Sequence, residues 1–334
     1  LITAAYNLGI AHPPGYPLYS LLGKFFITVL PFGSAAYKVN LMSALFGSFA
    51  VLFLYLALLE LFKLMHSADS RESGVKLIIA SFAAAAFAFS KVFWSEALVA
   101  EVFTLNAFFT AVLVYLLLKI YSEEKTGHVY AFSFIYGLSF ANHHSMILLA
   151  PAFGFIFLLK SKMLKAGVLA FCAGLFILGL LAYLYLPIRA SQNPPLNWGD
   201  PSSLANFMKV LARSQYGSTQ LAPVAYAGSS FSFIKDQSYA FIAQLARQFT
   251  IFGFSIGLIG LFYAFRRNWK LSVFLLTAFI VSGPLFILYS RMPLETGAQD
   301  VLQRFYIVPS IFFCFWIMEG MVFFSALIRL KFIL

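Results

Sequence analysis

The chain has 334 residues, of which 61% are hydrophobic and 10% are charged, and its formal net charge is +11. Soluble domains carry about 25% charged residues, so a soluble protein of this composition would need an implausibly large apolar core, and we predict a polytopic membrane protein. The positive charge does not indicate nucleic-acid binding, because many lysines and arginines fall in short gaps between apolar runs, which is the distribution that orients membrane proteins.

The N-terminal segment contains the stretch His12-Pro13-Pro14-Gly15-Tyr16-Pro17-Leu18-Tyr19. Its prolines exclude a helix interior, because proline removes a backbone donor and fixes φ. A rigid turn with polar side chains beside a bilayer indicates a built site. Residues 18–30 are apolar but too short to span the membrane. We therefore predict an interfacial or re-entrant helix there, with Ser34 as the cap of the first span.

Apolar runs predict nine spanning helices after this segment. They cover roughly residues 37–63, 76–91, 99–120, 129–141, 145–160, 165–187, 238–265, 271–289 and 305–328. Alternation places residues 1–36, 92–98, 142–144, 188–237 and 290–304 on one face, and the basic short gaps on the other. The first face is therefore predicted to be extracytoplasmic. We expect an all-helical, multi-pass integral membrane protein with one domain over residues 1–334, in a bacterial inner membrane or a eukaryotic endomembrane.

The long external segment 188–237 begins with a dense turn around Asn193–Pro201. Ser202 or Ser203 can cap the helix that follows. In that helix Leu204, Phe207, Met208 and Leu211 follow the i, i+3, i+4, i+7 spacing of an apolar face. This pattern predicts an amphipathic helix on the membrane surface.

Polar and aromatic side chains from distant segments fall on the predicted external face. They are His12, Tyr16, Tyr19, Trp94, Glu96, Glu101, Asn142, His143, His144, Arg189, Trp198, Asp200, Arg304 and Tyr306. A site at this boundary could meet both a lipid-borne group and an external acceptor. We therefore expect the functional site here.

Glu101 is predicted to lie just inside the third span, where a carboxylate is costly and usually faces a cavity or a partner. It lies seven positions after Trp94, which predicts a shared helical face, whereas Glu96 is predicted to diverge from it. The alternative, in which both carboxylates lie among hydrated headgroups, stays open. Glu319, in the last span, is predicted to form a hydrogen bond inside the bundle.

Two adjacent histidines, His143 and His144, separate two short predicted spans. Neighbouring helical residues point about 100° apart, so joint chelation of one metal is not expected. Contact with a phosphate and a plain polar helix end are the two alternatives. For Arg189 and Arg304, the planar guanidinium suits phosphate, and interfacial anchoring is the alternative. The sequence predicts no cofactor and gives no indication of a divalent metal.

The stretch from Leu8 to Tyr19 closely resembles the first external loop of glycosyltransferase family 117, whose animal members include a protein O-mannosyltransferase. Further matching stretches are Phe93–Asn106, Asn142–His144, Leu186–Arg189, Asn197–Pro201 and Arg304–Tyr306. More distantly, the chain is similar to glycosyltransferases of the GT-C type. The resemblance covers nearly the whole sequence.

This resemblance implies a GT-C membrane fold and a polyprenyl- or dolichyl-phosphate sugar donor. A hexose, such as mannose, would pass to a hydroxyl of a protein or glycan acceptor on the extracytoplasmic side. The resemblance also implies that the catalytic acid lies upstream of Leu1, together with a first span. The chain is thus expected to be an N-terminally truncated piece, with residues 1–36 as part of the first external loop.

The resemblance also suggests roles for the candidate residues. Glu101 and His12 would support catalysis. The donor phosphate and the substrate would be bound by His143, His144, Arg189, Arg304, Tyr16, Trp198, Asp200 and Tyr306. Two competing interpretations are a transporter or flippase of a lipid-linked or anionic solute, and a non-catalytic assembly subunit.

Overall fold

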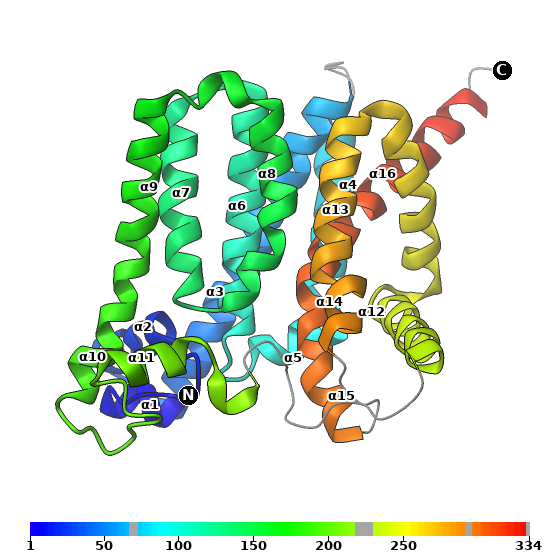
Figure 1. The fold of residues 1–334 in the computed structure, drawn as a ribbon. Helices are drawn as coiled ribbons and strands as arrows, with labels where there is room; N and C mark the ends of the chain where they lie inside the picture. The colour runs from blue at the N-terminus through cyan, green and yellow to red at the C-terminus, as the bar shows by residue number, and fades with distance from the viewer. Residues whose placement is uncertain (67–72, 218–229, 291–295, 332–334) are drawn as a thin grey trace.

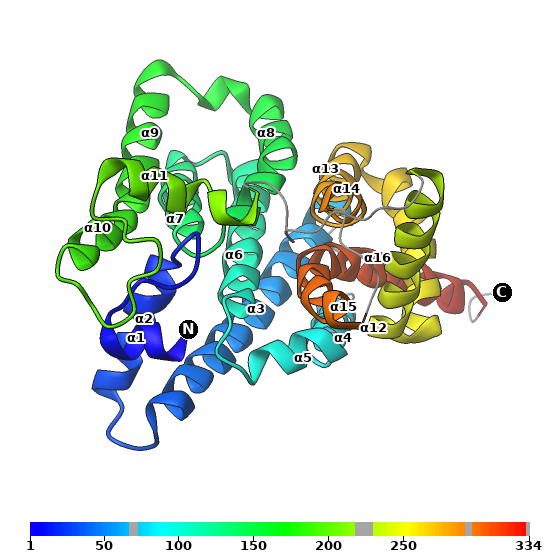
Figure 2. The same ribbon diagram turned by 60° about the horizontal axis from the view of Figure 1, so that its bottom comes forward.

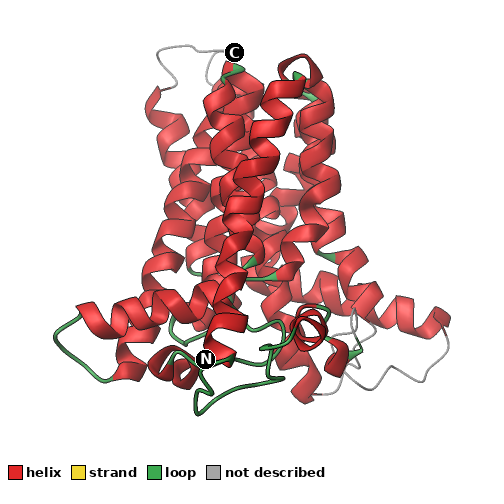
Figure 3. Cartoon of the chain, turned by 60° about the vertical axis from the view of Figure 1, so that its left-hand side comes forward, coloured by secondary structure: helices red, strands yellow, loops and turns green. Residues whose placement is uncertain are grey.

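The computed structural model of the protein describes residues 1–66, 73–217, 230–290 and 296–331 (Figure 1). The described part contains helices and a single isolated parallel bridge between Ile10 and Asn197, with no strand (Figure 3). The predicted all-helical fold is therefore confirmed. Those parts of the predicted segments 188–237 and 290–304 that fall in the gaps lie outside the described residues.

Six helices of the described chain are long and apolar enough to cross a membrane, or seven if one bent pair counts as a span. The six are Ala35–Met65, Phe103–Glu123, Ala166–Ala190, Phe231–Arg267, Trp269–Ser290 and Gln299–Ile328, and the bent pair is Gly74–Ala88 with Lys91–Ala97. The prediction of nine spans is therefore not confirmed. The helix Thr126–Phe140 (α7) has 15 residues, which is about 22 Å and shorter than a bilayer core.

The long helices stand side by side (Figure 1). Helix α3 (Ala35–Met65) packs along α6 (Phe103–Glu123), and α7 packs along α9 (Ala166–Leu180). On the other side, α12 (Ser230–Arg267) packs along α16 (Ile307–Lys331). Helix α6 is central, because 83% of its apolar window is buried, whereas only 17% is buried in the span that contains α9.

The remaining elements complete the chain between these helices. They are α4 (Ser73–Ala88), η2 (His144–Leu149), α8 (Ala150–Leu159), η3 (Ser161–Met163), η4 (Leu181–Leu184), α13 (Trp269–Ser282), α14 (Pro284–Ser290) and η6 (Arg304–Tyr306). Helix α13 packs against α16 and α8, and α4 packs against α3 and α16. These contacts join the two groups of helices into one bundle.

Short helices gather at the end of the bundle that holds the N-terminus (Figure 1). They are α1 (Ile2–Asn7), α2 (Pro17–Val29), α5 (Lys91–Ala97), α10 (Tyr185–Ala190), α11 (Leu204–Leu211), η5 (Ser214–Tyr216) and α15 (Thr296–Gln303). Figure 2 shows α1, α2, α10 and α11 beside one another, with α5 and α15 across from them. This end corresponds to the face that charge distribution predicts to be extracytoplasmic.

The predicted short helices and their caps are confirmed. Helix α2 begins at Pro17, and α3 is capped by Ser34, whose hydroxyl accepts the Tyr37 N–H at 3.3 Å. In the same way Ser203 caps α11 by accepting the Asn206 N–H at 3.2 Å. Each cap satisfies one of the N–H groups that a helix start leaves without a partner.

Polar groups at the opposite end of the bundle are paired with one another. The buried Glu319 carboxylate lies 3.0 Å from Nε2 of His66, which confirms the predicted hydrogen bond inside the bundle. The buried Glu60 carboxylate lies 3.0 Å from Nζ of Lys63 and 3.8 Å from Nζ of Lys119. These contacts satisfy the carboxylates locally.

Candidate active site

A cavity of about 700 Å³ opens at the end of the bundle that carries the proline-rich turn. Its wall is built from that turn, the start of α6, the junction of α7 and η2, the segment after α11, and the α14–η6 region. Its polar and titratable lining comprises His12, Tyr16, Glu101, His143, His144, Ser145, Arg213, Tyr216, Tyr289 and Arg304. The rest is apolar, so the cavity combines a large apolar wall with convergent polar groups, as ligand sites do.

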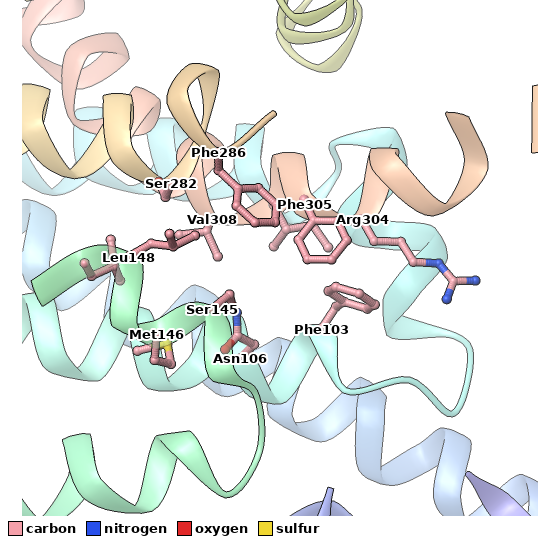
Figure 4. Close-up of a pocket in the computed structure, with 12 residues that line it drawn as sticks. Phe103, Asn106, Ser145, Met146, Leu148, Ser282, Phe286, Arg304, Phe305 and Val308 are labelled. Atoms are coloured by element: carbon pink, nitrogen blue, oxygen red, sulfur yellow. Dashed lines mark hydrogen bonds between the residues drawn. The ribbon is translucent and has the colours of Figure 1, made fainter. Parts of the chain in front are cut away.

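A narrow apolar crevice continues from this cavity between η2 and the α14–η6 region (Figure 4). Phe103, Phe286 and Phe305 line both spaces, and their rings pack together, with centroids 5.4 Å apart for Phe103 and Phe305. The guanidinium carbon of Arg304 lies 5.8 Å from the centre of the Phe103 ring, at the edge of this cluster (Figure 4). The aromatic cluster therefore closes the inner side of the cavity.

The structure brings six of the sequence-predicted residues to this cavity: His12, Tyr16, Glu101, His143, His144 and Arg304. They come from four separate segments, and the first and last of them, His12 and Arg304, are 292 positions apart in the chain. The proline-rich turn positions two of them, because Tyr16 adopts a left-handed backbone at φ 43° and begins α2. The roles predicted for these residues remain predictions.

Arg189 does not line the cavity. Its Nε donates to the carbonyl of Leu8 at 2.8 Å, its Nη2 donates to the carbonyl of Asn7 at 3.3 Å, and Nη1 bonds Gln192. The guanidinium thus caps the C-terminus of α1 and stabilises the fold there. The geometry does not favour the predicted binding of phosphate by Arg189.

Trp198, Asp200 and Tyr306 also lie outside the cavity lining. The Trp198 ring meets the edge of His12 at 6.3 Å, and its Nε1 donates to Gln215 at 2.7 Å. Asp200 accepts a hydrogen bond from Asn197 at 3.1 Å, and Tyr306 is buried against Phe241. Trp198 therefore contacts His12 from outside the cavity lining, and the binding roles predicted for Trp198, Asp200 and Tyr306 remain predictions.

Arg304 forms an ion pair with two carboxylates at the rim of the cavity. Its Nε lies 3.3 Å from Glu96 Oε1, and its Nη1 lies 3.1 Å from Glu101 Oε1. The prediction that Glu96 and Glu101 diverge on one helix is wrong, because the chain bends between α5 and α6. Glu101 lies in that bend and not inside a span, so both carboxylates reach the same guanidinium.

The two adjacent histidines make different hydrogen bonds. Nδ1 of His143 accepts the backbone N–H of Ser145 at 3.1 Å. Tyr183 donates its hydroxyl hydrogen to the carbonyl of Phe140 at 2.5 Å, so Nε2 of His144, 2.6 Å away, donates to the tyrosine oxygen. These contacts leave Nε2 of His143 and Nδ1 of His144 available to a ligand.

Burial keeps the histidines of the cavity neutral. It lowers the pKa of His143 to about 3 and that of His144 to about 4. Burial also lowers the pKa of His12, although the nearby Glu101 carboxylate opposes this shift. At neutral pH these side chains can therefore exchange hydrogen bonds with a ligand, but the positive charge of the cavity comes from its arginines.

We expect the folded protein to lose stability as the pH falls below 6.5, the unperturbed pKa of histidine. Below that pH the unfolded chain takes up protons that His143 and His144 in the folded protein do not. Each contributes a slope of about 1.4 kcal/mol per pH unit until its folded pKa is reached. Thermal unfolding in detergent, recorded at a series of pH values from 6.5 down to about 4, measures this slope. His144→Gln should flatten the slope by about that amount, and an unchanged slope would show that His144 is not the cause.

Arg213 lines the cavity but was not among the residues predicted from the sequence. It follows the end of α11, where its backbone has a left-handed φ of 52°. The sequence signal was its place just beyond the predicted amphipathic helix, away from the apolar face of that helix. The left-handed backbone, which turns the chain toward the cavity, could not be inferred from that pattern.

The described residues contain no group of three or more His, Cys, Asp or Glu side chains placed to hold a metal ion. Cys172 and Cys314 are free and do not line the cavity. The chemistry available at the cavity is therefore that of imidazoles, two guanidiniums, a paired carboxylate and hydroxyls.

Comparison with known proteins gives a consistent result. Residues 1–166 match the family described as "Protein O-mannosyl-transferase TMEM260 N-terminal domain". The chain is 37% identical over 243 residues to Protein O-mannosyl-transferase TMEM260 of Mus musculus, across 70% of this chain and 33% of that protein. It is 28% identical over 343 residues to Protein O-mannosyl-transferase tmem260 of Dictyostelium discoideum, across 93% of this chain and 39% of that protein.

The chain thus spans only 33% and 39% of the lengths of these curated relatives. No solved structure is significantly similar to it. The family match covers the proline-rich turn, Glu101, His143 and His144, which all line the cavity. The chain is therefore similar to the protein O-mannosyl-transferases, and its first 166 residues are similar to the N-terminal domain of that family.

Proposed function

We propose that this protein is a membrane glycosyltransferase that moves a hexose, such as mannose, from a polyprenyl- or dolichyl-phosphate donor to a hydroxyl of a protein acceptor. The observation that carries the proposal is the cavity itself. Its polar lining falls largely within the region similar to protein O-mannosyl-transferases. The names of the relatives supply the reaction class, and the apolar wall of the cavity suits a lipid-linked donor.

In the proposed reaction the acceptor oxygen attacks the anomeric carbon of the sugar. The bond between that carbon and the phosphate oxygen breaks, and the acceptor proton passes to a general base. Negative charge develops on the leaving phosphate, so positive groups there stabilise the transition state. The cavity offers two guanidiniums for this purpose, those of Arg213 and Arg304.

The neutral imidazoles are suited to orienting the sugar and the acceptor. Nε2 of His143 and Nδ1 of His144 are not used by the contacts described above. We assign supporting roles to Glu101 and His12. Glu101 is held in an ion pair with Arg304, and His12 packs between the rings of Tyr16 and Trp198.

The distribution of charge supports an extracytoplasmic site. The helix ends away from the cavity carry Lys63, Lys119 and Lys160. Cytoplasmic loops of membrane proteins carry an excess of lysine and arginine, so this end is expected to be cytoplasmic. Two buried carboxylates of the described chain at that end are paired, Glu60 with lysines and Glu319 with His66. A transport pathway would favour polar groups available from both ends, so this arrangement favours an enzyme with a cavity open at one end.

The experiment that tests the proposal uses the purified full-length protein in liposomes. It receives polyprenyl-phosphate mannose and an acceptor peptide rich in serine and threonine, and mass spectrometry detects the product. We expect a mass increase of one hexose on the peptide, and none when a nucleotide-linked mannose replaces the lipid donor. Folded protein that transfers none of several lipid-linked hexoses would refute the proposal. Movement of the lipid across the liposome without transfer would support the transporter instead.

A further inference from the structure

Arg213 and Arg304 differ in how their charge is compensated. Arg304 pairs with Glu96 and Glu101. No carboxylate of the described chain forms an ion pair with Arg213. Its Nε is also buried and has no hydrogen-bond acceptor within the described chain. Its guanidinium lies 5.6 Å from the centre of the Tyr216 ring. A buried donor of a charged group without an acceptor is costly, which indicates that this position is completed by a ligand.

The carboxylate that lines the same cavity, Glu101, is paired with Arg304, and no described carboxylate forms an ion pair with Arg213. Its positive charge contributes to the low pKa values of His12, His143 and His144, which are neutral at neutral pH. Arg213 is therefore close enough to these three side chains to act on them, and they leave its charge uncompensated. An anion beside Arg213 would meet a guanidinium together with neutral hydrogen-bonding groups.

An apolar groove of about 410 Å³ begins beside this position. It shares His144 and Leu211 with the cavity, and Leu211 precedes Arg213 by two residues. Its other walls are Phe140, Ile177, Leu180, Leu181, Tyr183, Leu184 and Phe207. The cavity and the groove thus meet at the end of α11.

The groove opens on a face that suits contact with lipid. Ile177 is 58% exposed and Leu181 is 46% exposed. Both belong to the candidate span Ala166–Ala190, of which only 17% of the apolar window is buried in the protein. A hydrocarbon chain in the bilayer can therefore enter the groove without crossing a polar surface.

We propose that Arg213 binds the phosphate of a lipid-linked substrate whose hydrocarbon chain lies in the groove between α9–η4 and α11. This proposal rests on the proposed function for the statement that the lipid is the sugar donor. The position of the phosphate and of the chain follows from the geometry of Arg213 and the groove. The guanidinium fork matches two phosphate oxygens, so lysine is a poor replacement.

The test measures binding to the purified full-length protein in detergent, without any transfer. The probes are farnesyl phosphate, farnesol and inorganic phosphate. The variants are Arg213→Ala, Arg213→Lys and Leu181→Trp, which fills the groove. Lys209→Ala is the matched control, because Lys209 is a cation on α11 that is exposed and does not line either space.

We expect farnesyl phosphate to bind the wild-type protein more tightly than farnesol or inorganic phosphate does. Arg213→Ala should weaken binding of farnesyl phosphate about tenfold to a hundredfold, the range for a lost hydrogen bond to a charged group, and leave farnesol unchanged. Arg213→Lys should recover only part of this loss. Leu181→Trp should weaken both lipids and spare inorganic phosphate. Lys209→Ala should match the wild type.

Unchanged binding of farnesyl phosphate in Arg213→Ala would overturn the assignment of the phosphate position, and unchanged binding in Leu181→Trp would overturn that of the groove. Equal binding of farnesol and farnesyl phosphate to the wild type would contradict both the anion site and its link to the groove. A failure of the proposed function would give a different result. A protein that shows the expected binding pattern but transfers no hexose would support this lipid site and refute the proposed transferase activity.

Discussion

Replacing Arg304 with alanine should destabilise the folded protein by about 2 kcal/mol or more and remove transfer activity. The substitution leaves Glu96 and Glu101 close together without a counter-charge. Breaking a buried ion pair by removing one partner costs about 3–5 kcal/mol, and the partial exposure of Arg304 lowers this figure. Thermal unfolding in detergent measures the change.

Controls can separate the charge from the packing at this site. Arg304→Lys retains a positive charge and should recover about half of the lost stability. The double variant Arg304→Met with Glu96→Gln removes the buried charge as well, and it should be more stable than Arg304→Ala. If Arg304→Ala unfolds at the wild-type temperature, the ion pair does not contribute to the fold. If Arg304→Ala retains full transfer, Arg304 has no role at the proposed site.

Gly179→Ala should destabilise the protein by about 3 kcal/mol, the upper part of the usual range for overpacking. A Cβ at Gly179 would lie 2.5 Å from the backbone nitrogen of Leu138 and 2.6 Å from the carbonyl oxygen of Phe134. Both atoms belong to the backbone of α7, so they cannot move aside as a flexible side chain does. Helices α7 and α9 would therefore have to move apart, because membrane helices approach this closely only where small residues such as glycine face the neighbouring helix.

Gly174 provides a matched control within the same helix. It is exposed, and a Cβ there would meet nothing within 4 Å. Gly174→Ala should therefore be neutral or stabilising by up to about 1 kcal/mol, because alanine favours the helix. The unfolding temperatures of the two variants should move in opposite directions or differ widely. Equal effects would show that the approach of α7 and α9 does not limit the residue at position 179.

Much of the fold could be predicted from apolar runs and turn residues. The caps at Ser34 and Ser203 and the short helix α2 followed from local signals, which depend on neighbouring residues only. The number of spans could not be predicted in this way. Apolar composition does not separate a helix that is long enough to cross the bilayer from a shorter one such as α7, which has 15 residues.

The candidate site was predictable in its location and less so in its contacts. Topology placed His12, Glu101 and His143 at one boundary, and the structure brings them to one cavity. The pairing of Arg304 with two carboxylates depends on the bend between α5 and α6, which the continuous apolar pattern concealed. The position of Arg213 depends on a left-handed backbone that its sequence context does not signal.

Filling the cavity tests the central claim, that the proposed transfer takes place there, most directly. Ile147 lines the cavity and is 55% exposed, so Ile147→Trp adds volume inside it without disturbing a packed core. Ile78 on α4 is 57% exposed and does not line the cavity, which makes Ile78→Trp the control. In the liposome assay with polyprenyl-phosphate mannose we predict loss of transfer in Ile147→Trp and wild-type transfer in Ile78→Trp, and full transfer by a folded Ile147→Trp would contradict the account.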